Sequence, residues 1–280
     1  MSSPSEVVTR ALLRDWGLPD PGDSKKSRGR VIVVGGSRRA PGAALLAGEA
    51  ALRVGAGRLG LVVPRSIDGQ LGVTMPEAAV FAMPEDAGDT FDDVVLTELE
   101  SADAVLLGPG FDDAEQTLAT LRRVGSVGVR CLVLDAFALG ILSEVPRSEL
   151  PAALILNPNK EEAAILLGRD LGNDPVADVS EIARRFDAIV NCYGTVATPT
   201  GRTWQVKVGG PGLGTSGSGD VLAGAIAGFA ARGGEPSRAA VWGSWTHARA
   251  GDRLAARTGI GFLAREIATE LTPTLAETIG

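Results

Sequence analysis

Runs of apolar residues alternate with mixed polar and apolar segments along most of the chain. These runs are rich in Val, Ile and Leu and show no alternation with polar residues. They occupy residues 31–34, 59–63, 104–107, 131–134 and 153–156. Such runs are typical of central strands in a parallel sheet that is covered on both faces. Since helical segments separate the strands from Val31 to Asn191, the pattern predicts an α/β fold with a mainly parallel sheet and helices on both faces.

The N-terminal residues have a different character. They are polar and contain Pro and Gly, with a short helix expected over Glu6–Trp16 and a linker after it. The basic stretch around Lys25 is expected to be a solvated surface. We therefore divide the chain into an N-terminal arm, residues 1–30, and one α/β domain, residues 31–280.

The chain is organised around a glycine-rich loop that leads into an apolar run, residues 209–230. The loop lets backbone N–H groups face a ligand, and the proline-free run predicts a helix that begins at about Asp220. A carboxylate beside a phosphate normally repels it. Asp220 therefore fits a base that takes a proton from a hydroxyl while Gly217, Ser218 and Gly219 hold the transferring phosphoryl group. The alternative is that Asp220 is only the N-cap of the helix.

Two common nucleotide motifs do not explain this loop. The sequence contains no G-x-x-x-x-G-K-[ST], so the loop is not a Walker P-loop. Residues 212–217 fit G-x-G-x-x-G, but the match lies late in the chain, and Asp220 would face the pyrophosphate of a dinucleotide.

Composition excludes several other classes of function. Apolar residues make up 45% of the chain, enough for a sizeable core, and the net charge of −7 argues against a nucleic-acid partner. A single His and two Cys without metal spacing leave no multi-His zinc site and little room for a His-based triad. No apolar run reaches the length of a membrane span, and we expect a cytoplasmic protein.

The glycine-rich stretch GTSGSGDVLAG, residues 214–224, resembles the G-[ST]-G-D signature of the ribokinase-like superfamily. Within it, residues 31–277 resemble the ADP- or ATP-dependent NAD(P)H-hydrate dehydratases, and the block GGSRRAPGAALLAGEAALRVGAGRLGLVVP at 35–64 is the most family-specific part. The resemblance implies a ribokinase-like fold without a separate lid. It also implies repair of hydrated NADH or NADPH, in which ADP or ATP with Mg²⁺ phosphorylates the ring hydroxyl and phosphate then leaves.

The same resemblance assigns residues to the substrate. Ala43, at the PGAA helix start, is expected beside the hydrated nicotinamide, together with Gly110, Asn159 and the catalytic Asp220. Gly110 lies in a Gly-Pro-Gly turn at the end of a predicted strand, where a plain tight turn has the same sequence.

Pro158-Asn159-x-x-Glu162 resembles the P-N-x-x-E motif of the ribokinase-like sugar kinases. There the Asn and Glu organise water around a nucleotide-bound Mg²⁺, so Glu162 is expected to hold the metal through water. Hydrate dehydratases usually carry His at the position of Asn159. This leaves open a kinase that phosphorylates an alcohol of a sugar or vitamin precursor. A helix N-cap with acidic residues in the first turn also satisfies the pattern.

The resemblance also places the nucleotide. It would contact Gly217, Ser218 and Gly219 and the segment Asn191, Cys192, Tyr193, Gly194 and Thr195. Dehydratases normally carry a Lys-Gly pair in that segment, next to the nucleotide phosphates, and this sequence has no Lys there. A nucleotide-binding protein without catalysis is therefore a third class. His247 fits the H-x-x-x-G of the family's penultimate helix, although a lone His on a mixed helix is more often structural.

The expected partners are thus hydrated NAD(P)H and an adenine nucleotide, with no membrane. Apolar helices at the surface predict a homo-oligomer.

Overall fold

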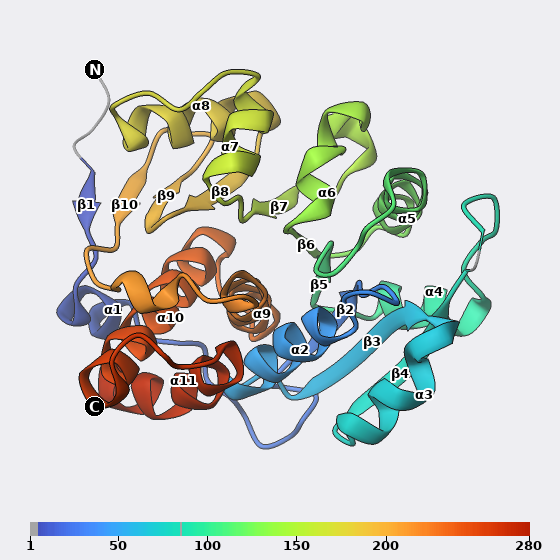
Figure 1. Ribbon diagram of the computed structural model, residues 1–280, viewed down its shortest axis with the longest axis horizontal. Coiled ribbons are helices and arrows are strands. Elements are labelled where there is room, and N and C mark those ends of the chain that lie inside the picture. The colour runs from blue at the N-terminus through green and yellow to red at the C-terminus, as the bar shows by residue number, and fades with distance from the viewer. Residues whose placement is uncertain (1–4, 85) are drawn as a thin grey trace.

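The computed structural model describes residues 5–84 and 86–280. Its strands form a single ten-stranded sheet in the order β1-β10-β9-β8-β7-β6-β5-β2-β3-β4 (Figure 1). The strands are β1 (Glu6–Val7), β2 (Arg30–Val34), β3 (Arg58–Pro64), β4 (Ala78–Met83), β5 (Ala104–Leu107), β6 (Cys131–Leu134), β7 (Ala153–Leu156), β8 (Ile189–Cys192), β9 (Thr195–Ala197) and β10 (Thr203–Gln205). Only β9 runs antiparallel to its two neighbours, β8 and β10, so the predicted mainly parallel sheet is confirmed.

Helices cover both faces of this sheet. They are α1 (Arg10–Trp16), α2 (Gly42–Arg53), α3 (Arg65–Thr74), α4 (Asp93–Glu100), α5 (Ala114–Ser126), α6 (Phe137–Gly140), α7 (Lys160–Leu167), α8 (Pro175–Phe186), α9 (Ser218–Ala231), α10 (Pro236–Thr258) and α11 (Ala264–Ile279). Helices α2, α9, α10 and α11 lie together on one side, and α5, α6, α7 and α8 lie on the other (Figure 1). A separate lid is absent from the described part of the chain.

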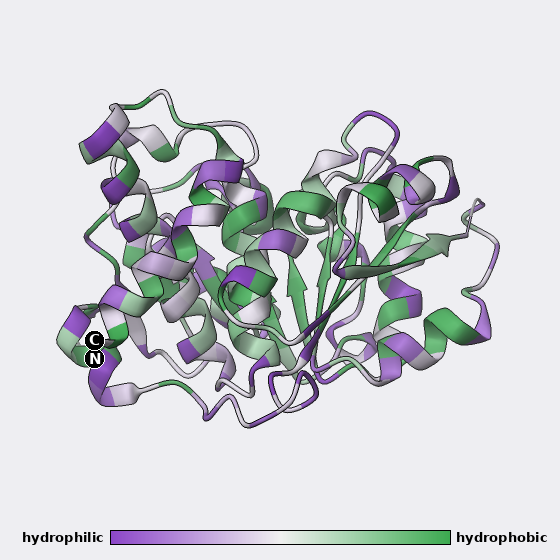
Figure 2. Ribbon diagram, turned by 90° about the horizontal axis from the view of Figure 1, so that it is seen from below, coloured by the Kyte–Doolittle hydropathy of each residue, from purple (hydrophilic) through white to green (hydrophobic). Residues whose placement is uncertain are grey.

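The central strands supply side chains to two cores, one on each face. Val31 and Val33 of β2 pack into the core beneath α2 and α9, whereas Ile32 and Val34 pack into the core beneath α4 and α5. Because successive side chains of a strand point to opposite faces, a continuous apolar run is what a sheet covered on both sides requires. Figure 2 shows these apolar strands at the centre, with polar residues concentrated on the outer helices.

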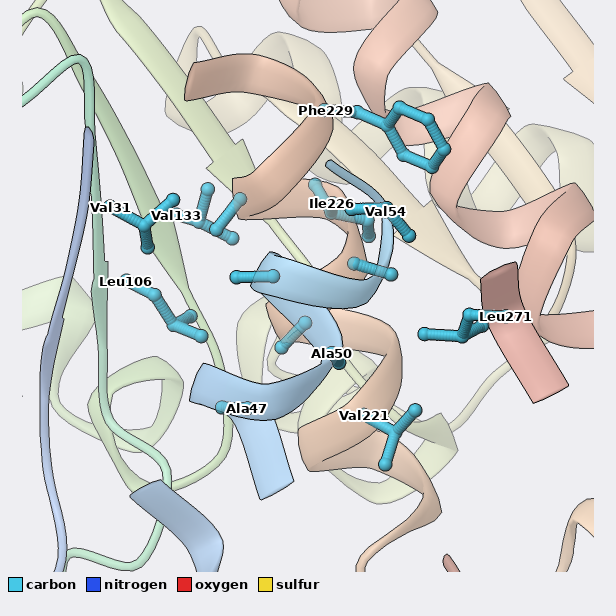
Figure 3. Close-up of a cluster of buried hydrophobic side chains, with 14 of the residues drawn as sticks. Val31, Ala47, Ala50, Val54, Leu106, Val133, Val221, Ile226, Phe229 and Leu271 are labelled. Atoms are coloured by element: carbon cyan, nitrogen blue, oxygen red, sulfur yellow. The ribbon is translucent and has the colours of Figure 1, made fainter. Parts of the chain in front are cut away.

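Helices α2 and α9 approach each other closely through small residues. A Cβ added at Gly224 would lie 2.0 Å from the carbonyl oxygen of Ala47, and one at Gly228 would lie 2.7 Å from that of Ala51. Ala47, Ala50 and Ile226 fill this contact (Figure 3). The contact holds the N-terminus of α9, and with it the glycine loop, against the sheet.

The described residues of the predicted N-terminal arm pack against the domain. The expected helix over Glu6–Trp16 is shorter, because Glu6 and Val7 form β1 and pair in parallel with β10. Leu13 of α1 is fully buried, and the rings of Trp16 and Trp204 meet edge to face at 6.0 Å. Residues 1–4 lie outside the described residues, and the division at residue 30 stays a prediction.

Helix boundaries near the C-terminus differ from those predicted. Helix α9 begins at Ser218, two residues before Asp220, and α10 continues four residues past Leu254 to Thr258. The closing helix does not begin at Ile260 but at Ala264, since Gly259 and Gly261 interrupt the chain there. The Thr198–Gly201 hairpin turn between β9 and β10 is confirmed. The expected loop at 84–93 contains Glu85, which lies outside the described residues.

The strand order reverses beside β2. From β2 the chain builds β3 and β4 to one side, and β5 to β8 to the other. The carboxyl ends of β2, β5, β6, β7 and β8 therefore meet at one edge of the sheet. Such a reversal point is where open α/β sheets bind ligands. Within the described residues, no helix combines the length and the apolar character that a membrane crossing needs.

Candidate active site

A cavity of about 650 Å³ lies at this edge of the sheet. Its floor comes from residues that follow β6 and β7, and one side comes from the turn between β8 and β9. The opposite side is the glycine-rich loop with the start of α9, and α10 closes the back. Residues predicted from widely separated motifs line it together, namely Asn159, Glu162, Tyr193, Gly194, Gly217, Ser218, Gly219 and Asp220.

The start of α9 combines free backbone donors with a carboxylate. Gly217 is the N-cap, with φ of +86°, and no side chain caps the helix. A side chain at Gly217 would also collide with Leu46, 2.5 Å from its Cβ. Asp220 is the third residue of the helix, so the alternative that Asp220 is its N-cap is wrong. Because the first turn of a helix has no preceding carbonyls to bond, its N–H groups are free to receive an anion.

The amides in this turn are not equivalent. The N–H of Ser218 donates to the carbonyl of Thr215 at 3.1 Å, and the N–H of Val221 donates to Gly217 at 3.2 Å. The N–H groups of Gly219 and Asp220 lie between these two. Gly219 is exposed and has open space where a Cβ would stand. Gly219 is therefore the residue of this turn with the most open space beside it.

The carboxyl group of Asp220 is directed back over this turn. Its Oδ2 lies 3.8 Å from the position that a Cβ would take at Gly217. Burial raises the pKa of Asp220 to about 6, and the negative charge of Glu162 adds to the rise. A carboxylate in this state is still ionised at neutral pH but holds a proton more strongly than an ordinary Asp, as a general base requires.

Asn159 and Glu162 form a capping box at the start of α7. The side-chain oxygen of Asn159 accepts from the N–H of Glu162 at 2.9 Å, and Glu162 accepts from the N–H of Asn159 at 2.9 Å. The helix N-cap interpretation is thus confirmed. Both residues also line the cavity, so capping does not remove them from the site. Burial raises the pKa of Glu162.

A buried polar chain crosses the ends of three adjacent strands. The side chain of Asn157 donates to Asp135 at 2.9 Å, and that of Asn191 donates to Asn157 at 2.7 Å. Burial raises the pKa of Asp135, and the charges of Asp220 and Glu162 raise it further. The next residue, Ala136, takes φ of +51°, an unfavourable conformation for alanine. Asp135 and Asn157 line the cavity floor.

His247 of α10 lines the back of the cavity and is buried. Its Nε2 lies 3.0 Å from Oγ of Ser218. Burial lowers the pKa of His247 to about 4, so the ring is neutral at physiological pH. This contact joins α10 to the first residue of α9, in the turn that carries Asp220.

The predicted substrate residues Ala43 and Gly110 lie together, next to the point where the strand order reverses. A Cβ at Gly110 would lie 2.9 Å from that of Ala43 and 3.1 Å from Cα of Gly36. Gly36 donates its N–H to the carbonyl of Pro109 at 2.7 Å. These two residues do not line the 650 Å³ cavity, so the predicted substrate residues divide between the cavity and this neighbouring contact.

The predicted nucleotide segment also divides. Tyr193 and Gly194 line the cavity, whereas Asn191, Cys192 and Thr195 do not and are buried. Asn191 is engaged with Asn157, and Thr195 belongs to β9. Contact between a nucleotide and these buried residues stays a prediction, and it would require their backbone rather than their side chains.

Sequence reasoning missed the apolar wall of the cavity. Val206, Val208, Leu213 and Leu222 line it, together with Ser244 and Ala248 of α10. The alternation of Val206 and Val208 around an exposed Lys207 is a strand-like signal that points both valines the same way. An apolar wall opposite polar groups suits a flat aromatic base.

A larger hollow of about 990 Å³ lies elsewhere, between the C-terminal end of α2 and residues 21–28. Arg28 donates there to the carbonyl of Gly55 at 3.1 Å, and Arg232 donates to that of Val54 at 2.7 Å. Both arginines therefore donate hydrogen bonds to backbone carbonyls at the C-terminal end of α2. None of the predicted site residues lines this hollow.

The cavity is strongly acidic. Asp135, Glu162 and Asp220 line it, and no Lys or Arg among the described residues does. Within the described chain, no three His, Cys, Asp or Glu side chains are grouped so that they could hold a metal ion by themselves. Mg²⁺ fits such a site, because it retains several waters and is often bound through one or two carboxylates together with phosphates.

The fold, the strand-edge cavity and the glycine loop that carries Asp220 define an α/β protein of the ribokinase-like superfamily. The family described as NAD(P)H-hydrate dehydratase matches residues 31–273. The chain belongs to this family, and the predicted resemblance is confirmed.

Individual relatives agree with this assignment. The chain is similar to the ADP-dependent (S)-NAD(P)H-hydrate dehydratase of Xanthomonas campestris pv. campestris, with 43% identity over 275 residues that cover 95% of this chain and 94% of the relative. It is also similar to the bifunctional NAD(P)H-hydrate repair enzyme Nnr of Moorella thermoacetica, with 34% identity over 82% of this chain. The match covers 46% of that longer relative.

Solved structures show the same fold. The ADP/ATP-dependent NAD(P)H-hydrate dehydratase of Bacillus subtilis, co-crystallised with ATP/Mg²⁺, superposes with a TM-score of 0.85 at 24% identity and covers 98% of this chain and 99% of that one. A ribokinase-like superfamily protein of Enterococcus faecalis gives a TM-score of 0.84 at 25% identity, with coverage of 98% and 96%. The predicted ribokinase-like fold is confirmed.

Proposed function

We propose that this chain is an ADP-dependent NAD(P)H-hydrate dehydratase that repairs hydrated NADH or NADPH. Similarity over nearly the full length to a relative with that activity supports the assignment. The observation that carries the chemistry is the placement of Asp220. Its carboxyl group, with a pKa raised to about 6 by burial and by Glu162, lies beside the free N–H groups of the first turn of α9.

The first step is phosphorylation of the hydroxyl on the hydrated nicotinamide ring. Asp220 takes the hydroxyl proton, and the oxygen attacks the terminal phosphorus of ADP. The bond between that phosphorus and the bridging oxygen breaks, and AMP leaves. The raised pKa makes Asp220 a stronger base than an ordinary Asp while leaving it ionised at neutral pH.

Backbone amides hold the transferring phosphoryl group. Gly217 and Gly219 are assigned to this group because both line the cavity, and the open space at Gly219 leaves room for the phosphoryl oxygens. Ser218 contributes differently from the sequence-based expectation, since its N–H already bonds Thr215 and its hydroxyl meets His247. Its role is to fix the turn.

The second step is elimination. The bond between the ring carbon and the phosphate oxygen breaks, phosphate leaves, and a proton is lost from the neighbouring ring carbon. The ring double bond returns, and the products are NADH or NADPH, AMP and phosphate. The same amides stabilise the negative charge on the departing phosphate.

Ala43, Gly110 and Asn159 are assigned to the hydrated ring. The close contact of Ala43 with Gly110 gives a wall without protruding side chains beside the point where the strand order reverses. The nucleotide is assigned to the other end, along Tyr193, Gly194 and the apolar wall of Val206 and Val208.

Glu162 is assigned to Mg²⁺ through water. Bound with the nucleotide, Mg²⁺ would neutralise phosphate charge in a cavity whose described lining includes no Lys or Arg. The contribution of this chain is to hold Glu162 in place through its bond with the N–H of Asn159.

The test is to incubate the protein with hydrated NADH, Mg²⁺ and either ADP or ATP, and to follow the return of the reduced-nicotinamide absorbance. The proposal expects this return with ADP, together with equimolar AMP. A stable phosphorylated product would instead indicate a small-molecule kinase, and nucleotide binding without turnover would indicate a non-catalytic protein. The predicted homo-oligomer is tested on the same sample by light scattering.

A further inference from the structure

Tyr193 is an exposed aromatic residue at the mouth of the cavity, in the turn between β8 and β9. Its side chain is 70% exposed, although Tyr is the kind of residue that proteins usually cover. Its backbone has φ of +46°, which costs a residue with a side chain about 1 kcal/mol or more. Residues in such conformations are concentrated at active sites and ligand-binding loops.

The ring of Tyr193 has a specific neighbour. The ammonium group of Lys160 lies 4.8 Å from the ring centroid, within the range of a cation–π interaction. The two residues come from different elements, since Lys160 begins α7 and Tyr193 follows β8. The ring of Tyr193 therefore fixes the position of the ammonium group at the end of the exposed Lys160 side chain.

The position of Lys160 is unfavourable for the helix itself. A cation in the first turn of a helix is repelled by the positive end of the dipole. None of the ion pairs among the described residues includes Lys160. The positive charge of Lys160 therefore neither stabilises α7 nor forms an ion pair with a carboxylate. It is available to bind an anion.

A positive charge near the cavity would favour binding of a nucleotide. Asp220 and Glu162 line the cavity, and its described lining contains no Lys or Arg, yet the proposed nucleotide brings several negative charges. Lys160 is not itself among the lining residues, but Asn159 before it and Tyr193, whose ring it faces, both line the cavity. Since the ammonium group lies 4.8 Å from the centroid of a ring that lines the cavity, it stands beside the cavity mouth.

We propose that Lys160 and Tyr193 form the phosphate-binding rim of the nucleotide site, in which the ring positions the ammonium group and the ammonium group binds the phosphates of a nucleoside diphosphate. This inference rests on the proposed function for the identity of the ligand. Lys160 is a binding residue, and Tyr193 is a positioning residue that acts through it.

The experiment compares two ligands by titration calorimetry: ADP in the presence of Mg²⁺, and adenosine, which has no phosphate. Lys160→Ala should weaken ADP binding about tenfold and leave adenosine binding unchanged, with Lys160→Arg restoring most of the loss. Tyr193→Phe should keep full ADP affinity, because the ring face remains. Tyr193→Leu should lose about three- to tenfold for ADP only.

Lys207→Ala is the matched control. Lys207 is exposed and lies between two residues that line the cavity, but it does not line the cavity itself. Its removal changes the net charge equally and should change ADP affinity less than twofold. An equal loss in Lys160→Ala and Lys207→Ala would overturn the proposal, because it would indicate only a long-range charge effect.

Two further outcomes would also overturn it. Unchanged ADP affinity in Lys160→Ala would show that Lys160 does not bind the phosphates, even if turnover of hydrated NADH is normal. A parallel loss of ADP and adenosine in Tyr193→Leu assigns the ring to the base instead. Conversely, ADP binding that depends on Lys160 in a protein that fails to turn over hydrated NADH supports the rim and contradicts the proposed function alone.

Discussion

Asp220, at the start of α9, and Glu162, at the start of α7, line the same cavity, where burial of Asp220 and then the charge of Glu162 raise the pKa of Asp220 to about 6. Both carboxyl groups lie in the first turn of a helix, where the positive end of the dipole normally stabilises a negative charge. The charge of Glu162 therefore adds to the basicity that burial gives Asp220.

The first prediction concerns Glu162→Gln. Removing the charge of Glu162 lowers the pKa of Asp220, so the acid limb of the kcat/KM profile should move below pH 6. Since burial is the larger cause, only part of the shift should disappear. The variant should also need more Mg²⁺ for half-maximal turnover. Glu161→Gln is the control, because Glu161 is exposed and does not line the cavity, and it should change neither. An unmoved acid limb in Glu162→Gln would contradict this coupling.

The second prediction concerns stability and pH at Asp220. A folded-state pKa raised from 3.8 to about 6 means that the folded protein holds this proton more tightly than the unfolded chain. Stability is therefore lost as pH rises through this window, and the full penalty is present above about pH 6. Asp220→Asn should raise the free energy of unfolding by about 1–2 kcal/mol at neutral pH.

Denaturant titrations of wild type and Asp220→Asn, at pH 7.5 and at pH 5, measure this difference. The gain should shrink at the lower pH, where wild-type Asp220 is mostly protonated. A destabilised Asp220→Asn would mean that the carboxylate makes a stabilising contact in the helix.

The third prediction separates two neighbouring glycines. Gly219→Ala meets open space and should change the free energy of unfolding by less than about 0.5 kcal/mol, yet its methyl group enters the cavity and should lower kcat/KM. Gly217→Ala faces Leu46 and a φ of +86°, and should destabilise the fold by about 1–3 kcal/mol. Thermal melts and turnover of both variants check the contrast, and normal kcat/KM in Gly219→Ala would place the phosphoryl group elsewhere.

The fourth prediction concerns the buried chain of Asp135, Asn157 and Asn191. Asn157→Leu removes the side chain that donates to Asp135 and accepts from Asn191, which should cost about 2–4 kcal/mol of stability. Asn173→Leu, in an exposed loop, is the matched control and should change stability by less than about 0.5 kcal/mol. Equal unfolding midpoints for the two variants would show that the buried chain is not structural.

Much of the fold could be predicted from sequence because its central strands are buried on both faces. Runs such as Val31–Val34 then contain only apolar residues. Such a run can be identified as a buried strand from the local sequence, without knowing which strands it pairs with. The short edge strand Glu6–Val7 could not be predicted. Its pairing with Trp204 and Gln205 joins residues far apart in the chain, and both of its side chains are exposed.

The site was predicted in part for a related reason. Asp220 and its glycines form one continuous motif, so their spacing alone indicates the chemistry. The position of Lys160 over Tyr193, and the bond between Ser218 and His247, depend on how separate elements pack, and no local pattern contains that information. The start of α9 was predicted too late, at about Asp220, because the glycines before it resemble a loop. The N-cap is Gly217.

The central claim is that Asp220 removes the proton from the hydroxyl of the hydrated nicotinamide ring. The most direct test measures single-turnover return of the reduced-nicotinamide absorbance with hydrated NADH, ADP and Mg²⁺, in wild type and in Asp220→Asn. The account predicts a loss of about 100-fold or more in Asp220→Asn, the scale of a missing general base, with ADP affinity retained. Turnover near the wild-type rate in Asp220→Asn would contradict it.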